Sequence, residues 1–263
     1  MAKFEDIKYS KRKGRAVITI NRPKVLNAFR AQTLYEMIEA VTDAWKDNSV
    51  GVVVLTGAGD EAFSTGGDQK AKKQPKGSKN LLGVGAYVAK LHYLIRNIPK
   101  PVIAAVKGYA IGGGNVLQVV CDLTIAADNA VFGQVGPRVG SVDAGFGTAY
   151  LSRIVGEKKA REMWYLCRKY GAEEALDMGL VNVVVPKAKL DAEVNRWCDE
   201  IIDKSPTALK VAKYSFNADT DSIFGISRMG LSSLELFHTT EESKEGVEAF
   251  IEKREVDFGK FRK

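Results

Sequence analysis

Three consecutive glycines, Gly112 to Gly114, occur in the stretch GYAIGGGNVLQVVCD (108–122), directly before an apolar segment of helical length. Because glycine has no Cβ, another group can come close to its backbone. A strand that ends at Tyr109 and a helix that begins near Gly113 would leave unpaired N–H groups at the helix start. These donors and the helix dipole favour a negatively charged group there. Close packing of strand on helix is the simpler alternative, but it explains one glycine better than three.

A second glycine turn, Gly66-Gly67-Asp68, lies in the stretch GAGDEAFSTGGDQK (57–70) and follows a strand expected at 51–57. Two such turns at two strand ends could direct two backbone N–H groups at one oxygen, which is the layout of an oxyanion hole. Loss of one such donor typically slows a reaction by ~10²–10³. The glycine triplet itself contains neither the dinucleotide fingerprint G-x-G-x-x-G nor the phosphate-loop ending G-K-[ST].

The elements that must position these turns form a mixed α/β pattern. Buried strands are predicted at 16–20, 51–57, 100–110 and 122–133. A helix is predicted between the first two strands, where apolar residues recur at helical spacing: Leu34, Met37, Ile38, Val41 and Trp45. From Ser205 the pattern becomes almost wholly helical. We therefore predict an α/β core at 1–200 and a helical C-terminal region at 201–263.

Composition limits the class of protein. The 263 residues are 45% hydrophobic and 27% charged, as in ordinary soluble domains. No apolar run approaches transmembrane length, and the N-terminal residues lack the apolar stretch of a signal peptide. Three widely spaced cysteines and two histidines do not suggest a disulfide framework or a metal site. We therefore expect a cytoplasmic protein with no membrane partner and no metal.

The formal net charge of +7 would suit a polyanionic partner, although a basic soluble surface explains it equally well. The segment KAKKQPKGSKN (70–80) contains five lysines and no apolar residue larger than alanine. That composition predicts a mobile loop. Because the loop follows the second glycine turn, a ligand that carries phosphate is expected nearby.

Five stretches of the chain resemble the crotonase (enoyl-CoA hydratase/isomerase) superfamily, in sequence and in order. They are NRPKVLNAF, AFSTGGDQ, KPVIAAVKGYAIGGGNVL, CDLTIAADNAVFGQVGPRVGSVDAGFG and EALDMGLVNVVVP. The resemblance implies a spiral of ββα turns, a homotrimer or homohexamer, and an acyl-CoA thioester as substrate, with coenzyme A as part of the substrate and no separate cofactor. It also implies that the N–H groups of Gly66 and Gly113 hold the thioester oxygen.

The hydratases of this superfamily place one catalytic glutamate two residues after the glycine triplet and another after the FGQ stretch. Val116 and Gly136 stand at these two positions. Hydration of a conjugated double bond uses two carboxylates, one as base and one as acid. Hydratase activity is therefore not expected.

Asp143 and Ser141 are the side chains that we expect to carry the chemistry. The motif GPRVGSVDAGFG resembles the subgroup that contains 1,4-dihydroxy-2-naphthoyl-CoA synthase and 2-ketocyclohexanecarboxyl-CoA hydrolase. Hydrogen bonding within a glycine-rich turn is the simpler role for both residues. The synthase closes a ring beside the thioester and the hydrolase opens one, and both reactions pass through a thioester enolate that an oxyanion hole would stabilise.

Two departures from the synthase pattern favour ring opening. The loop after GGDQK contains no tyrosine, and His238 stands where the synthases carry a tyrosine. We therefore predict hydrolytic cleavage of an alicyclic β-oxo acyl-CoA such as 2-oxocyclohexanecarboxyl-CoA, with the synthase reaction as the alternative. His238 is either a proton carrier near the site or a core or capping histidine.

The resemblance also implies residues along the coenzyme A path. Lys24, Val25, Ser64 and Gln69 are expected to line it, and Lys260 to reach a phosphate of a neighbouring subunit. An ordinary solvated charge is the alternative for each lysine. The helical region 201–263 is expected to serve oligomerisation and to cover the active site. Some members of the superfamily bind RNA, but the lysine-rich loop lacks the aromatic residues that stack on bases, so nucleic acid is not an expected partner.

Overall fold

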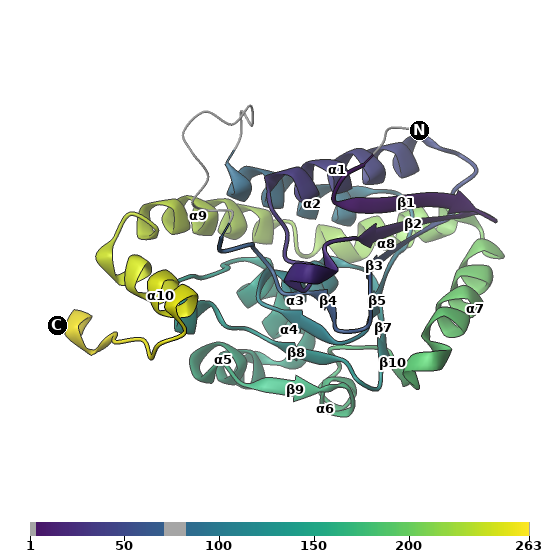
Figure 1. The fold of residues 1–263 in the computed structure, drawn as a ribbon. Coiled ribbons are helices and arrows are strands. Elements are labelled where there is room, and N and C mark those ends of the chain that lie inside the picture. Colours follow the sequence, from purple (N-terminus) through teal and green to yellow (C-terminus); the bar gives the residue numbers. More distant parts are fainter. Residues whose placement is uncertain (1–3, 71–82, 263) are drawn as a thin grey trace.

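The computed structural model describes residues 4–70 and 83–262 (Figure 1). Most of the lysine-rich loop, whose sequence contains no tyrosine, lies outside these residues. Among the described residues, no helix is long and apolar enough to cross a membrane. The chain folds into two sheets with helices packed around them.

The larger sheet has six strands in the order β1-β2-β3-β5-β7-β10. They span Ile7–Arg12 (β1), Arg15–Ile20 (β2), Val52–Gly57 (β3), Val102–Val106 (β5), Leu123–Ala127 (β7) and Val183–Val185 (β10). β1 and β2 form an antiparallel hairpin, and all other neighbours are parallel. The near-continuous valine, isoleucine and alanine runs of β3 and β5 fit this arrangement, because a parallel sheet is covered on both faces.

The smaller sheet has four strands in the order β4-β6-β8-β9, namely Ala62–Ser64, Tyr109–Ile111, Val131–Gly133 and Lys169–Gly171. Successive strand pairs β3-β4, β5-β6 and β7-β8 each give one strand to each sheet. Helix α2 (Val84–Asn97) follows the first pair and α3 (Gly113–Val120) the second. The predicted spiral of ββα turns is confirmed. Because β4 and β6 are parallel neighbours, the turns that follow them meet at one edge of the sheet.

The larger sheet has one apolar cluster on each face, and alternate residues of a strand belong to different clusters. Val53 and Leu55 of β3 belong to the larger cluster, with residues of α1 (Ala31–Lys46), α2 and α3. Val52 and Val54 belong to the smaller cluster, which α7 (Leu190–Ile202) covers. Alternation with a period of two explains why neighbouring valines face opposite layers.

The chain after α7 contains α8 (Pro206–Ala218), α9 (Ser222–Phe237), α10 (Glu241–Glu252) and a 3-10 turn (Gly259–Phe261). The predicted helical C-terminal region is confirmed, while its separation from the core at residue 200 stays a prediction. Figure 1 shows α9 and α10 on the side of the molecule opposite α7. Lys213 connects α8 to the core: its Nζ donates a hydrogen bond to the Ile95 carbonyl at 2.9 Å and forms a salt bridge with the Asp122 carboxylate at 2.7 Å.

The remaining elements are short and connect these layers. They are 3-10 turns at Pro23–Val25, Gly136–Val139 and Lys187–Lys189, a π-helical turn at Phe146–Tyr150, and helices α4 (Leu151–Val155), α5 (Glu157–Leu166) and α6 (Ala172–Asp177). Two of them, the turns at Gly136–Val139 and Phe146–Tyr150, enclose the loop that contains Ser141 and Asp143.

Candidate active site

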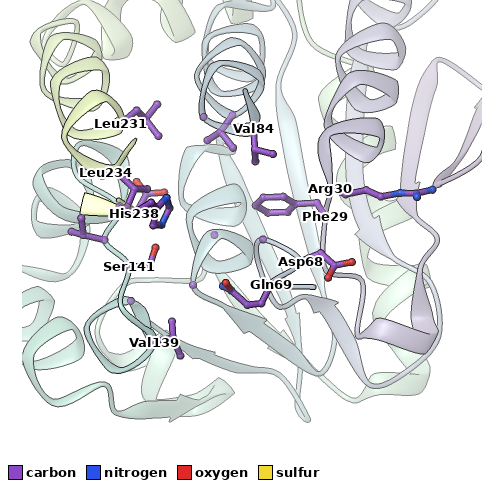
Figure 2. Close-up of a pocket in the computed structure, with 18 of the residues that line it drawn as sticks. Phe29, Arg30, Asp68, Gln69, Val84, Val139, Ser141, Leu231, Leu234 and His238 are labelled. Atoms are coloured by element: carbon purple, nitrogen blue, oxygen red, sulfur yellow. The ribbon is translucent and has the colours of Figure 1, made fainter. Parts of the chain in front are cut away.

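A cavity of about 950 Å³ opens where the two glycine turns meet. One wall comes from the turns themselves and from Phe29, and a second from the loop at 134–143. The first turns of α2 and the facing sides of α9 and α10 complete it. Figure 2 shows Phe29 reaching into the cavity, with Ser141, Leu234 and His238 on the wall that faces it. Residues from nearly the whole length of the chain therefore meet in one cavity.

The two glycine turns touch each other through their backbones. A Cβ added at Gly66 would lie 2.8 Å from the Gly113 nitrogen, and one added at Gly113 would lie 2.8 Å from Cζ of Phe29. Gly66 also has a φ of +83°, a conformation that side chains disfavour. The prediction that both turns serve one site agrees with this contact, and any side chain at Gly113 would displace Phe29 or the facing turn.

Gly66 was predicted as the second N–H donor, but its contacts favour the neighbouring Gly67. The Gly66 nitrogen lies 3.2 Å from Oγ of Ser64, which accepts its hydrogen bond. Gly67 lines the cavity and Gly66 does not. Within the described residues, the N–H groups of Gly67 and Gly113 have no hydrogen-bond acceptor. These two N–H groups are therefore the pair that could hold a negatively charged oxygen.

Asp143 lies in the cavity wall, and its carboxylate is partly buried. A Cβ added at Gly147 would lie 3.2 Å from both Cβ and Oδ1 of Asp143, and 3.1 Å from Cγ2 of Val116. Burial raises the pKa of Asp143 to about 7, although the backbone N–H of Gly147 opposes the shift. A carboxylate with this pKa can both take up and release a proton near neutral pH, which suits an acid–base catalyst.

Of the two positions where hydratases carry glutamates, one holds a buried apolar side chain and the other has no room for a side chain. Val116 is fully buried. At Gly136, an added Cβ would lie 2.6 Å from the Ser141 carbonyl oxygen and 2.8 Å from the Trp164 ring. A side chain at Gly136 would therefore require the loop that contains Ser141 to move.

Ser141 and His238 both line the cavity, while their catalytic roles stay predictions. The Ser141 N–H donates to the Gly136 carbonyl at 2.8 Å, which fixes the loop backbone. His238 caps the C-terminal end of α9, where its N–H donates to the Leu234 carbonyl at 2.9 Å. His238 is thus a capping residue through its backbone and a cavity residue through its side chain (Figure 2).

Two polar side chains of the cavity were not singled out from the sequence. His92 on α2 and Gln134 after β8 line the cavity and are only 2% and 1% exposed. Within the described residues, Nδ1 of His92 and both amide atoms of Gln134 have no hydrogen-bond partner. Buried polar atoms are normally paired, so these enclosed atoms are exceptions in the cavity wall. His92 lies outside the stretches that resemble the superfamily. Gln134 lies in the FGQ stretch, but the motif does not reveal that its amide is buried and unpaired.

The residues predicted to line the coenzyme A path differ in their placement. Gln69 lines the cavity. Lys24 and Val25 lie in the exposed turn at Pro23–Val25, outside the cavity wall. Ser64 is fully buried, and its hydroxyl donates to the Asn27 carbonyl at 2.9 Å.

Lys260 lies in the C-terminal turn, and its Nζ is 3.2 Å from a Glu245 oxygen within the same chain. Its predicted contact with a neighbouring subunit stays a prediction. Among the described residues, no group of three or more His, Cys, Asp or Glu side chains could hold a metal ion.

Comparison with known proteins gives consistent matches over the whole chain. A family model described as "Enoyl-CoA hydratase/isomerase" matches residues 10–261. An enoyl-CoA hydratase from Mycobacterium avium subsp. paratuberculosis K-10 is 26% identical with a TM-score of 0.87, and the match covers 97% of this chain and 99% of that one. An enoyl-CoA hydratase/isomerase from Pseudoalteromonas atlantica T6c is 25% identical, with a TM-score of 0.89 and coverage of 97% and 100%. An enoyl-CoA hydratase from Bacillus anthracis is 28% identical, with a TM-score of 0.75 and coverage of 97% and 99%.

Proposed function

Because this chain belongs to the enoyl-CoA hydratase/isomerase family, we infer that it processes an acyl-CoA thioester, and we propose that it hydrolyses a carbon–carbon bond in an alicyclic β-oxo acyl-CoA. The expected substrate is 2-oxocyclohexanecarboxyl-CoA or a related ring, and the product is a dicarboxylate mono-CoA ester. The observation that carries the proposal is the carboxyl of Asp143, whose pKa is raised to about 7, in the same cavity as the two glycine turns.

Several similar proteins are named enoyl-CoA hydratases, so hydration is the first alternative to the proposed reaction. Hydration needs a base for the attacking water and an acid for the α-carbon, which a pair of carboxylates supplies. In this chain, Val116 and Gly136 stand where that pair is expected, and Gly136 has no room for a side chain. This difference supports a reaction that one acid–base group can serve.

In the proposed reaction, Asp143 takes a proton from a water molecule while the water oxygen adds to the ring ketone. The resulting alkoxide collapses to a carboxylic acid, and the bond to the α-carbon breaks. The electron pair of that bond becomes the thioester enolate, whose oxygen the N–H groups of Gly67 and Gly113 would hold. Asp143 then returns its proton to the α-carbon. One water is consumed, and coenzyme A takes part only as a portion of the substrate.

We assign supporting roles to Ser141 and His238. Both line the cavity, so Ser141 could hold the attacking water, and His238 could carry a proton or contact the acyl group. Replacement of each by alanine should lower the turnover number less than replacement of Asp143. A full loss with Ser141→Ala and none with Asp143→Asn would reassign the base.

Ring closure by the 1,4-dihydroxy-2-naphthoyl-CoA synthase reaction is the second candidate, because it passes through the same kind of enolate. His238 in place of a tyrosine favours opening over closure. An RNA-binding role is disfavoured, because a carboxyl and two backbone N–H groups without acceptors among the described residues line one cavity, which suits small-molecule chemistry.

Mass spectrometry of the products would decide between these reactions. Purified protein is incubated separately with 2-oxocyclohexanecarboxyl-CoA and with succinylbenzoyl-CoA. Ring opening adds one water to the mass of the first compound, whereas closure removes one water from the second. Turnover of succinylbenzoyl-CoA with the alicyclic substrate untouched would replace the proposed hydrolysis by the synthase reaction.

We also propose a homotrimer or homohexamer in which the C-terminal helices make contacts between subunits. Large apolar side chains of α8, α9 and α10 are exposed in the single chain, among them Phe216, Met229, Leu236 and Phe250. Exposed apolar residues of this size mark interaction surfaces. Light scattering after size-exclusion chromatography would give the subunit number, and a monomer at micromolar concentration would contradict the proposal.

A further inference from the structure

His92 is an isolated polar group in a mostly apolar part of the cavity wall. It lies on α2 and is 2% exposed, and it lines the cavity together with Val88 of the same helix and Leu117 of α3. Its ring meets that of Phe146 edge-on, with 5.5 Å between the ring centroids. Apolar packing alone would be served better by a leucine at this position, because a buried imidazole loses its hydrogen bonds to water.

The two ring nitrogens of His92 differ in their surroundings. Nδ1 is enclosed and has no hydrogen-bond partner among the described residues. Nε2 makes no hydrogen bond to the described residues and is not among the enclosed unpaired atoms, so we infer that Nε2 is the nitrogen directed to the cavity that His92 lines. Burial lowers the pKa of His92 to about 4. The imidazole is therefore neutral in the working pH range and can present one N–H to a bound molecule.

His92 and Asp143 border the same short segment of chain. Phe146 contacts the His92 ring, and the next residue, Gly147, contacts the Asp143 side chain. The N–H groups proposed for the thioester oxygen come from the glycine turns, not from this segment. We place the second oxygen of the acyl group near Asp143, in the cavity that His92 also lines.

We propose that His92 donates a hydrogen bond from Nε2 to the oxygen on the β-carbon of the acyl group and thereby selects β-oxygenated acyl-CoA substrates. The inference rests on the proposed function, in which this oxygen is the ring ketone that receives the water. As water adds, the ketone oxygen becomes an alkoxide, and a neutral N–H donor stabilises it without transferring a proton. Retention of the negative charge is required, because the alkoxide must collapse to break the carbon–carbon bond.

Binding of unreactive analogues tests this role without turnover. Cyclohexanecarboxyl-CoA lacks the second oxygen, and the diastereomers of 2-hydroxycyclohexanecarboxyl-CoA carry it as a hydroxyl. Titration calorimetry should show about tenfold tighter binding of at least one hydroxylated diastereomer to the wild-type protein, the usual net value of one hydrogen bond. Equal affinities for all the analogues would overturn the proposal.

Variants then identify the residue that is responsible. His92→Leu should remove the preference and leave the affinity for cyclohexanecarboxyl-CoA nearly unchanged, and His92→Gln should restore part of the preference. Gln134→Leu is the matched control, because it also removes a buried, unpaired polar side chain from the same cavity. Loss of the preference in Gln134→Leu but not in His92→Leu would assign the second oxygen to Gln134 and refute the proposal. Melting temperatures confirm that each variant is folded.

The outcomes separate this inference from the proposed function. If the wild-type protein prefers the hydroxylated analogue through His92 but does not open 2-oxocyclohexanecarboxyl-CoA, the proposed reaction fails and the recognition role stands. If the ring is opened but the preference is absent, the reaction stands and the role of His92 fails.

Discussion

Replacement of Asp143 by asparagine tests the proposed base through stability as well as rate. Burial raises the pKa of this carboxyl from 3.8 to about 7, so the folded protein disfavours its ionised form. Between these two pH values the unfolded chain loses the proton while the folded chain keeps it, and the free energy of unfolding therefore falls as pH rises. The loss of stability caused by the ionised Asp143 carboxylate is absent below pH ~4 and complete above pH ~7. There it reaches about 4 kcal/mol, at 1.36 kcal/mol per pKa unit.

Asparagine has nearly the same shape as aspartate and does not ionise. Asp143→Asn should therefore be more stable than the wild-type protein by up to about 4 kcal/mol at pH 8, but by no more than about 2 kcal/mol at pH 5. Guanidinium unfolding at both pH values measures the difference. The exposed Asp219, which pairs with Arg153 at 2.8 Å, gives a matched control: Asp219→Asn should change stability little at either pH.

The same variant should turn over the ring substrate ~10²–10⁴ more slowly, because the amide cannot accept a proton from water. The dissociation constant of cyclohexanecarboxyl-CoA should change little. In the wild-type protein, kcat/KM should rise with pH to a plateau above about pH 7. Equal stability of the wild-type protein and the variant at both pH values would refute the raised pKa. A variant that is less stable at pH 8 would show that the carboxylate has a structural role.

Three further predictions concern the glycine turns, the missing acids and the helical region. Gly113→Val should abolish turnover in a folded protein, because its Cβ would lie 2.8 Å from Phe29, whereas Gly225→Val, which meets no atom within 4 Å, should stay active. Near-normal activity of Gly113→Val in a product assay would remove Gly113 from the oxyanion hole. Crotonyl-CoA should be hydrated at trace rate only, as followed by the loss of its conjugated absorbance, and fast hydration would reveal another acid–base pair. Lys213→Met should lower the free energy of unfolding by about 3 kcal/mol in guanidinium titrations, because it removes the cation that pairs with the Asp122 carboxylate at 2.7 Å, and an unchanged midpoint would contradict this.

Local patterns predicted the mixed α/β core, the helical C-terminal region and the two glycine turns, whereas the spiral of ββα turns was predicted only from the resemblance to the crotonase superfamily. The second turn was predicted to follow the strand at 51–57, but the short strand β4 lies between them, and its parallel pairing with β6 brings the two turns together. The choice between Gly66 and Gly67 could not be predicted, because it depends on which N–H the Ser64 hydroxyl binds. A two-glycine turn has the same sequence in either case.

His92 and Gln134 show a different limit of sequence interpretation. A histidine in a helical segment and a glutamine after a strand occur in most proteins. Their meaning comes from two properties of the folded chain, namely burial and the lack of a partner within the described residues. Lys24 and Val25 show the opposite limit: both belong to a motif that matches the superfamily, yet neither lies in the cavity wall.

Construction of the anion site from main-chain N–H groups has a consequence for how the protein can be inactivated. Amide groups of the backbone do not titrate, oxidise or react with the reagents that modify lysine, arginine, histidine or cysteine. The donors at Gly67 and Gly113 should therefore keep their strength across the pH range in which the fold persists. These two donors can therefore be blocked only by a molecule that occupies the cavity, and an acyl-CoA mimic with a negatively charged oxygen at the thioester position has the matching chemistry.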